Sequence, residues 1–357
     1  MSLNILSYVF IIGLLIILSL FIINSILVWM FSLSFLTCYI SLYLIQNLIP
    51  FFDRNNIIAL DLHKKKKPKI ANSGGIPVSL SLMIGTMVYI AVQRFVFGIS
   101  EEMVYLFASV LTILLITIIG FFDDLNRSDV LLGKRKIRKG LKKWQKPLFA
   151  IPAAIPLMVV SAGVTTMGIP FLGSINFGIL YPLFLIPIGV VGAANAINLL
   201  GGFNGSEAGM GVIYCLSLGI YALLHNELVS ATIFFSTVGA LIGFLYYNWY
   251  PARMLSGDSL TYCLGAVVAS GVIIGNMERA GIIVMTPFII EFLLKLRSKF
   301  KASCLGKLRN DGKLDPPYRK KVYSWTHIIM NLSALTEKQV TMILIIIQII
   351  FGLLLFL

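Results

Sequence analysis

Long apolar runs are the feature that most limits what this chain can fold into. Stretches of about 18 or more residues with few charges recur, and each is long enough to cross a bilayer as a helix. They do not alternate apolar and polar residues as membrane β-barrel strands do. Charged residues make up only 12% of the 357 residues, against about 25% in soluble proteins. The sequence therefore predicts an all-α, polytopic transmembrane helical protein with the lipid bilayer as a partner. It excludes an ordinary soluble enzyme and a nucleic acid partner.

The basic residues indicate which helix ends share one side of the membrane. Of the 29 Lys and Arg residues, 26 lie in three segments, 53–69, 124–146 and 295–338. By the positive-inside rule all three segments should be cytoplasmic. An even number of spans between neighbouring segments satisfies this rule, and the apolar runs supply two and then six. The expected spans are 76–98, 103–122, 147–163, 179–200, 206–224, 229–249, 258–276, 281–297 and 339–357.

Residues 3–51 are apolar almost throughout. One helix of that length would measure about 70 Å, more than twice the roughly 30 Å hydrocarbon core. We therefore expect two spans with a break near Asn24 and Ser25, which gives about eleven spans in total. One long helix, and so ten spans, is the alternative. The whole chain, 1–357, is expected to form one membrane domain, made of the N-terminal spans 1–51, a catalytic membrane core 52–298, a cytoplasmic loop 299–338 and a final span 339–357.

Polar clusters lie at span ends on the predicted cytoplasmic side. Ionisable groups are costly in hydrocarbon, so each such group is a hypothesis about function. Asp123 and Asp124 close the span 103–122, and adjacent carboxylates suit Mg²⁺ binding or proton abstraction. A solvated helix end would look the same. Asp258 follows the turn former Gly257, and a carboxylate there would also suit the positive end of a helix dipole.

The segment 195–209 holds the richest cluster. Asn195 and Asn198 are three residues apart and share a helix face, and their amides can coordinate a hard cation or bind a polar ligand. Tight packing of small residues is common between membrane helices. It accounts for the glycines but not for three Asn together with Glu207. The glycines permit positive φ angles and close approach of a ligand; they are Gly201, Gly202, Gly205 and Gly209.

The lysine run 64–67 precedes Gly74 and Gly75, which open the span 76–98. The lysines alone indicate contact with anionic lipids and an anchor for topology. A glycine pair at the start of a span is less easily explained in that way. We therefore count this segment as a fourth cluster on the same side.

Taken together and in order, from about residue 60 to 300, these clusters resemble the polyprenyl-phosphate N-acetylhexosamine-1-phosphate transferases. The segment 195–209 is most similar to the archaeal and eukaryotic UDP-GlcNAc:dolichyl-phosphate branch. Where bacterial members usually have Asp-Gly-x-Asp-Gly, this chain has Gly-Gly-Phe-Asn-Gly at 201–205. The resemblance implies an enzyme that transfers GlcNAc-1-phosphate from UDP-GlcNAc to a polyprenyl (dolichyl) phosphate and releases UMP. That reaction is the first step of lipid-linked oligosaccharide assembly for N-glycosylation.

The resemblance also implies roles for single residues. Asn198 and Asp258 would hold Mg²⁺, with Mn²⁺ as an alternative. Asp123 would orient or deprotonate the lipid phosphate, and Asp124 would support it. Lys146 would bind phosphate, although it is also one of nine positive charges in its loop. The substrate-binding residues implied within the glycine-rich segment are Asn195, Asn204 (at the uracil), Gly205 and Glu207.

The last loop, 299–338, departs from the family pattern. Eukaryotic relatives carry an Arg-His-Arg-x-Pro-Arg-like segment there and the bacterial translocase has a histidine cluster, whereas 306–317 contains no histidine. Arg309 is the candidate for contact with the diphosphate, and the role of His327 stays open. The identity of the sugar therefore also stays open. The same chemistry with another UDP-N-acetylhexosamine, for a cell-envelope glycan, is the alternative.

A transporter of a polyprenyl-linked sugar or a small molecule is the alternative of a different class, since glycine-interrupted helices also mark substrate pathways. The polar clusters here lie at span ends rather than at midspan, and no inverted repeat is visible in the sequence. A CDP-alcohol phosphatidyltransferase is disfavoured because its Asp-Gly-x2-Ala-Arg signature is absent. The expected location is the cell membrane if the chain is archaeal and the endoplasmic reticulum membrane if it is eukaryotic. Whether the protein forms a homodimer is left open.

Overall fold

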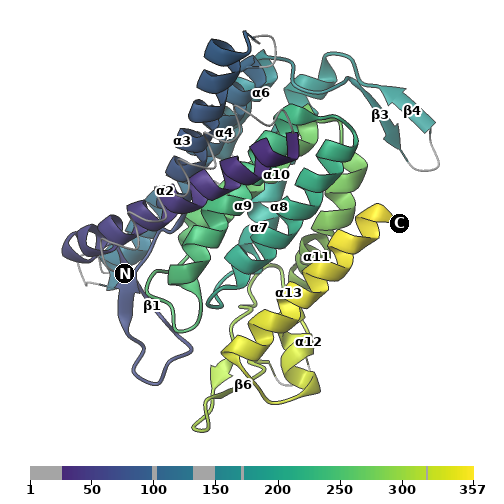
Figure 1. Cartoon of the computed structure of the whole chain (residues 1–357). Helices are drawn as coiled ribbons and strands as arrows, with labels where there is room; N and C mark the ends of the chain where they lie inside the picture. The colour runs from purple at the N-terminus through teal and green to yellow at the C-terminus, as the bar shows by residue number, and fades with distance from the viewer. Residues whose placement is uncertain (1–25, 99–102, 132–148, 170–172, 319–320) are drawn as a thin grey trace.

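The computed structural model describes residues 26–98, 103–131, 149–169, 173–318 and 321–357, and its long helices run side by side as a bundle (Figure 1). Within these residues, eight helices are long and apolar enough to cross a membrane. This confirms the predicted polytopic helical protein. The helices concerned are α2 (Ile26–Arg54), α3 (Gly75–Val96), α4 (Met103–Leu131), α7 (Ile186–Asn198, entered through a π-helical turn Tyr181–Leu185), α8 (Ser206–Leu224), α9 (Leu228–Asn248), α10 (Gly257–Ile274) and α13 (Glu337–Leu353).

Three of the eleven expected spans are not among these eight helices. The expected span 281–297 is present as α11, Glu278–Leu296, but this helix carries charged residues that include Glu291 and Lys295. Of the span 147–163, the described part holds a 3₁₀ helix and the short helix α6 (Ile155–Val159). The first N-terminal span and the break expected near Asn24 and Ser25 lie outside the described residues, and α2 covers the second expected span.

Short strands lie beyond the helix ends. β1 (Ile58–Leu60) pairs antiparallel with β2 (Lys69–Ala71), and β3 (Thr166–Ile169) with β4 (Gly173–Asn176). The expected loop 299–338 forms an antiparallel sheet and helix α12 (Trp325–Leu332). In Figure 1 the β3–β4 hairpin lies at the opposite end of the bundle from β1, β6 and α12. The strands of that second sheet are β5 (Lys307–Leu308), β6 (Lys313–Asp315) and β7 (Leu335–Thr336).

Helix α10 lies at the centre of the bundle, with 94% of its span buried. Small residues let neighbouring backbones approach closely, which drives helix packing in membranes where the hydrophobic effect cannot. A Cβ on Gly75 of α3 would lie 2.2 Å from the carbonyl carbon of Ser259, and one on Gly120 of α4 would lie 2.7 Å from the Cα of Ser259. A Cβ on Gly265 would lie 2.2 Å from the Cα of Ala194 in α7. These contacts bring the start of α3 and the C-terminal part of α4 to the first turn of α10.

Backbone hydrogen bonds also tie β2 to the turn between α9 and α10. The N–H of Leu255 donates to the carbonyl of Ala71 at 2.8 Å, and the N–H of Gly74 donates to the carbonyl of Leu255 at 3.0 Å. Residues 71 and 254 also form a parallel bridge. The segment from β1 to the start of α3 is therefore fixed beside the first turn of α10.

Candidate active site

A cavity of about 430 Å³ opens where several helix ends meet. Its walls come from the C-terminal ends of α7, α9 and α11, the N-terminal ends of α8 and α10, β1 with the residues after it, and the segment 300–305. The sequence predicted that the polar clusters share one side, and members of three of them line this one cavity. The predicted site residues among its lining are Asn198, Asn204, Glu207 and Asp258.

Asp258 lies in the first turn of α10, and its side chain is 3% exposed. The carboxylate of Asp124, in the C-terminal part of α4, accepts the backbone N–H of Asp258 at 2.8 Å and that of Ser259 at 3.1 Å. The first N–H groups of a helix have no partner within the helix, and a carboxylate there is stabilised by the dipole. Asp124 therefore positions the helix end that carries Asp258.

Gly257 makes this contact possible. Its φ is +68°, a conformation that side chains other than glycine rarely adopt. A Cβ at this position would lie 2.3 Å from Oδ2 of Asp124. Gly257, which the sequence indicated as a turn former, thus also leaves room for the Asp124 carboxylate that caps α10.

Asp123 is buried beside this contact but does not line the cavity. Asn198, in the last turn of α7, is half-buried and does line it. Asn195 shares its helix face, but its amide donates to the carbonyl of Val191 at 2.8 Å and it is not part of the cavity wall. The structure therefore brings Asn198 and Asp258 to one cavity and does not bring Asn195 there.

The glycine-rich turn between α7 and α8 is held by side chains. Glu207 accepts the backbone N–H of Gly202 and the hydroxyl of Ser206, both at 2.7 Å. Gly205 has φ +80°, and its N–H donates to Oδ1 of Asn248 at 3.0 Å. The predicted substrate-binding residues Glu207 and Gly205 thus shape the turn.

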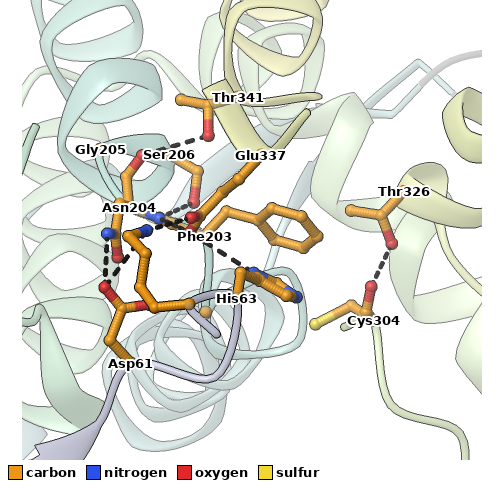
Figure 2. A network of polar contacts seen from close by, with 12 residues as sticks. Asp61, His63, Phe203, Asn204, Gly205, Ser206, Cys304, Thr326, Glu337 and Thr341 are labelled. Carbon is orange, nitrogen blue, oxygen red and sulfur yellow. Dashed lines mark hydrogen bonds and ion pairs between the residues drawn. The ribbon is translucent and has the colours of Figure 1, made fainter. Parts of the chain in front are cut away.

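Asn204 is 3% exposed and stands at the centre of a polar network shown in Figure 2. Its amide donates to Oδ2 of Asp61 at 3.0 Å, and its backbone N–H donates to Oε1 of Glu337 at 2.9 Å. Its carbonyl accepts the hydroxyl of Thr341 at 3.1 Å. An ionised carboxylate only accepts hydrogen bonds, so Asp61 fixes which way the amide of Asn204 faces.

Sequence analysis missed Asp61 and Glu337, and it counted Lys64 only as part of a basic run. The Lys64 ammonium lies 2.6 Å from Oε2 of Glu337, 3.3 Å from Oδ2 of Asp61, and 3.8 Å from the ring centre of Tyr250. The ring of His63 packs on Phe203, and its Nδ1 lies 3.4 Å from Oε1 of Glu337. In the sequence, the signal for this network was Asp61, an acidic residue just before the lysine run 64–67.

The opposite wall of the cavity comes from α11 and the segment that follows it. Lys295 lines the cavity, and its ammonium donates to the carbonyl of Ala302 at 3.0 Å. Cys304 also lines it, with Sγ 3.0 Å from the carbonyl of Gly201. Burial raises the pKa of the Cys304 thiol to about 11, so it stays protonated near neutral pH.

His327 is explained by its backbone contacts. Nδ1 accepts the N–H of Tyr323 at 3.1 Å, so Nε2 carries the proton and donates to the carbonyl of Ser303 at 2.9 Å. Burial lowers the pKa of His327 below its ordinary value, which favours this neutral form. The histidine therefore shapes the segment that lines the cavity.

The remaining predicted residues are Arg309 and Lys146. Arg309 is 44% exposed on the β5–β6 hairpin and pairs with Asp311 at 3.4 Å and Asp315 at 3.6 Å. It does not line the cavity. Lys146 lies outside the described residues. The roles predicted for both stay predictions.

Comparison with known proteins identifies the family. Residues 106–276 match glycosyl transferase family 4. The chain is 33% identical over 293 residues to the UDP-N-acetylglucosamine–dolichyl-phosphate N-acetylglucosaminephosphotransferase of Saccharolobus solfataricus, covering 82% of this chain and 84% of that relative. It is 26% identical over 349 residues to the protein of that name in Dictyostelium discoideum, covering 85% of this chain and 82% of the relative.

A bacterial protein is also similar. The phospho-N-acetylmuramoyl-pentapeptide-transferase of Streptococcus thermophilus is 29% identical over 249 residues, covering 68% of this chain and 71% of that relative. The archaeal and eukaryotic relatives cover more of the chain than this bacterial one does. That order agrees with the similarity predicted from the glycine-rich segment. The expected family is thus confirmed, and the chain belongs to glycosyl transferase family 4.

Proposed function

We propose that this protein transfers GlcNAc-1-phosphate from UDP-GlcNAc to a polyprenyl phosphate of the dolichyl type, giving polyprenyl-diphosphate-GlcNAc and UMP. The observation that carries the proposal is the single cavity lined by Asn198, Asn204 and Asp258 at one end of a membrane bundle. The names of the archaeal and eukaryotic relatives support UDP-GlcNAc as donor and dolichyl phosphate as acceptor.

The proposed reaction is a displacement at phosphorus. An oxygen of the lipid phosphate attacks the β-phosphorus of the donor, which bears the sugar. The bond from this phosphorus to the bridging oxygen breaks, and UMP leaves with the electron pair. In this proposal the carboxylate of Asp123 keeps the lipid phosphate deprotonated by accepting its proton, and Asp124 keeps the first turn of α10 in place.

The donor set of the cavity fits a hard divalent cation. Asp258 offers a carboxylate and Asn198 an amide oxygen, and Mg²⁺ is usually bound through one or two carboxylates together with substrate phosphates. We propose that these two residues hold Mg²⁺, with Mn²⁺ as the alternative. When bound, such an ion neutralises charge on the donor diphosphate.

We also propose that the cavity faces the cytoplasm. The support is the distribution of charge, since 26 of the 29 Lys and Arg residues fall in three segments that the span count brings to one side. The membrane would be the cell membrane in an archaeon and the endoplasmic reticulum membrane in a eukaryote.

The decisive experiment measures UMP release by the purified protein with dolichyl phosphate, across a panel of UDP-sugars, with Mg²⁺ or with EDTA. We expect release from UDP-GlcNAc that requires both the lipid and the metal. Release only from another UDP-N-acetylhexosamine would keep the reaction and replace the donor. No release from any donor, with folded protein and several polyprenyl phosphates, would overturn the proposal in favour of a transporter.

Two substitutions test the residue roles in the same assay. Asp258→Asn should abolish metal-dependent turnover while the protein remains folded, and full activity in this variant would remove Asp258 from the metal site. Asp123→Asn should lower turnover more than it weakens UDP-sugar binding. Equal losses in turnover and binding would contradict its role at the lipid phosphate.

A further inference from the structure

Lys295 is a buried lysine that no part of the proposed reaction uses. It lies in the last turn of α11, is only 4% exposed, and lines the cavity. Lysine is almost never fully buried in proteins unless it is paired, because removing an ammonium from water is costly. Lys295 has such a partner in Glu291, whose Oε1 lies 3.6 Å from its ammonium, but this pairing does not explain why the lysine lines a ligand-sized cavity.

The contacts of Lys295 leave part of its hydrogen-bonding capacity unused. The ammonium donates to the carbonyl of Ala302 at 3.0 Å, and Oε1 of Glu291 lies 3.6 Å away, beyond hydrogen-bond length. Glu291 is itself fully buried, and its other oxygen accepts the backbone N–H of Trp325 at 2.9 Å. An ammonium has three N–H donors. A ligand in the cavity can therefore receive a hydrogen bond without displacing either contact.

The charges of the cavity wall show why this cation matters. Among the described residues that line the cavity, Asp61, Glu207 and Asp258 are acidic and Lys295 is the one basic residue. Asp61 is already paired with Lys64, and the oxygens of Glu207 accept the Gly202 N–H and the Ser206 hydroxyl. A polyanionic ligand entering this low-dielectric space is repelled by acidic groups and attracted by Lys295.

We infer that Lys295 binds the diphosphate of the nucleotide-sugar donor. This inference rests on the proposed function, because the donor is the ligand that brings a diphosphate to the cavity. By holding the carbonyl of Ala302, the same ammonium also places the 300–305 segment against the bound donor. Lys295 is thus a donor-binding residue on the wall that α11 supplies, away from the α7 and α10 ends that supply Asn198 and Asp258.

The test compares ligands that differ only in their phosphates. Binding of uridine, UMP, UDP and UDP-GlcNAc to the purified full-length protein is measured by calorimetry in detergent with Mg²⁺. Lys295→Met, which keeps an unbranched apolar side chain but removes the ammonium, should weaken UDP and UDP-GlcNAc binding by about 10- to 150-fold, the range for one hydrogen bond to a charged group. The affinity for uridine should change by less than about twofold, because uridine has no phosphate that Lys295 could contact.

Further variants separate charge from folding. Lys295→Met with Glu291→Gln removes the buried carboxylate that the single substitution leaves unpaired, and it should show the same loss for diphosphates. Lys295→Arg should retain most of the diphosphate affinity because it keeps the charge. Lys301→Met is the matched control, because Lys301 is exposed in the same segment and its removal should leave all four affinities unchanged.

The outcomes distinguish a binding role from a structural one. Equal losses for uridine and UDP in both methionine variants would show that Lys295 only holds the 300–305 segment, and would overturn the inference. Unchanged UDP affinity would overturn it as well, and so would a wild-type protein that binds none of the nucleotides. If the wild type binds UDP through Lys295 but releases no UMP in the transfer assay, the diphosphate site stands and the proposed function fails.

Discussion

Helices α8 and α10 begin at the same cavity, each next to a glycine with positive φ, but their first turns are anchored differently. At α10, the carboxylate of Asp124 from another helix accepts two backbone N–H groups. At α8, the N–H of Gly205 donates to the neutral amide of Asn248, and the carboxylate of Glu207 turns back to the preceding loop. One helix start is held by a charge and the other by a neutral amide.

The difference follows from what each helix end carries. The first turn of each helix carries a carboxylate that lines the cavity, Asp258 in α10 and Glu207 in α8, but the oxygens of Glu207 accept the Gly202 N–H and the Ser206 hydroxyl. Because Asp124 accepts the N–H groups of Asp258 and Ser259, the Asp258 side chain does not have to cap its own helix and faces the cavity. We therefore expect substitutions at α10 to cost more than equivalent substitutions at α8.

The largest effect is expected for Asp124→Ala. It removes two hydrogen bonds to a charged group and leaves two buried N–H groups without this acceptor, which should lower the free energy of unfolding by about 3 kcal/mol or more. Activity should disappear because Asp258 loses its position. Thermal unfolding in detergent and UMP release measure the two effects. Asp311→Ala, at an exposed carboxylate, is the control, and wild-type stability in Asp124→Ala would refute the capping role.

The glycines give the next contrast. Gly257→Ala places a Cβ 2.3 Å from Oδ2 of Asp124, whereas Gly205→Ala places one 2.7 Å from the ring of Trp249. Both substitutions also carry the cost of positive φ, about 1–2 kcal/mol. Gly257→Ala should lower the melting temperature and the activity more than Gly205→Ala does. It should cost less in an Asp124→Ala background, and strict additivity in that double-mutant cycle would contradict the steric explanation.

A smaller effect is expected at the neutral anchor. Asn248→Ala removes the acceptor for the Gly205 N–H and the donor to the Met254 carbonyl, which lies at 2.9 Å. We expect a loss of about 1–3 kcal/mol in unfolding free energy, the cost of leaving a buried polar group unsatisfied. Denaturant titration measures this loss. A larger loss than that of Asp124→Ala would reverse the proposed order of the two anchors.

The smallest effect is expected for Asp61→Asn. Its oxygen can still accept the amide of Asn204, and Lys64 keeps Glu337 at 2.6 Å. Stability should change by about 1 kcal/mol, the net contribution of a typical hydrogen bond, because Lys64 keeps its second partner. The amide of Asn204 can now turn over, because its partner both donates and accepts. The KM for UDP-GlcNAc should therefore rise a few-fold at unchanged kcat, and an unchanged KM would show that the orientation of Asn204 does not matter to the donor.

Much of the architecture could be predicted from the sequence, because hydropathy and charge act locally. The apolar runs gave the helices, and the count of spans between basic segments brought Asn198, Asn204, Glu207 and Asp258 to one side. The described helices meet that expectation, since these four residues line one cavity. Asn195 was predicted to bind substrate because it shares a helix face with Asn198. Its amide instead donates to the carbonyl of Val191 within the same helix.

The long-range contacts could not be predicted. Asp124 was expected to support its neighbour Asp123, but its hydrogen bonds cross 134 residues to the start of α10. Asn204 meets Asp61 across 143 residues and Glu337 across 133. Lys295 was counted as one basic residue of a segment. The four-residue spacing of Glu291 and Lys295 in the otherwise apolar C-terminal half of α11 was the signal that could have separated Lys295 from that segment.

The central place of α10 has a consequence for how the protein is made. A chain emerges from the ribosome in sequence order, and the helices that pack most closely around α10, namely α3, α4, α7 and α9, all precede it. The slot for α10 can therefore be assembled before α10 leaves the ribosome. The glycines at its contacts, Gly75, Gly120 and Gly265, suit insertion of α10 after its neighbours, because they leave room for close approach to backbones that are already in place. A larger side chain in place of a small residue on α10 would then first impair the insertion of this helix during synthesis, before any nucleotide is bound.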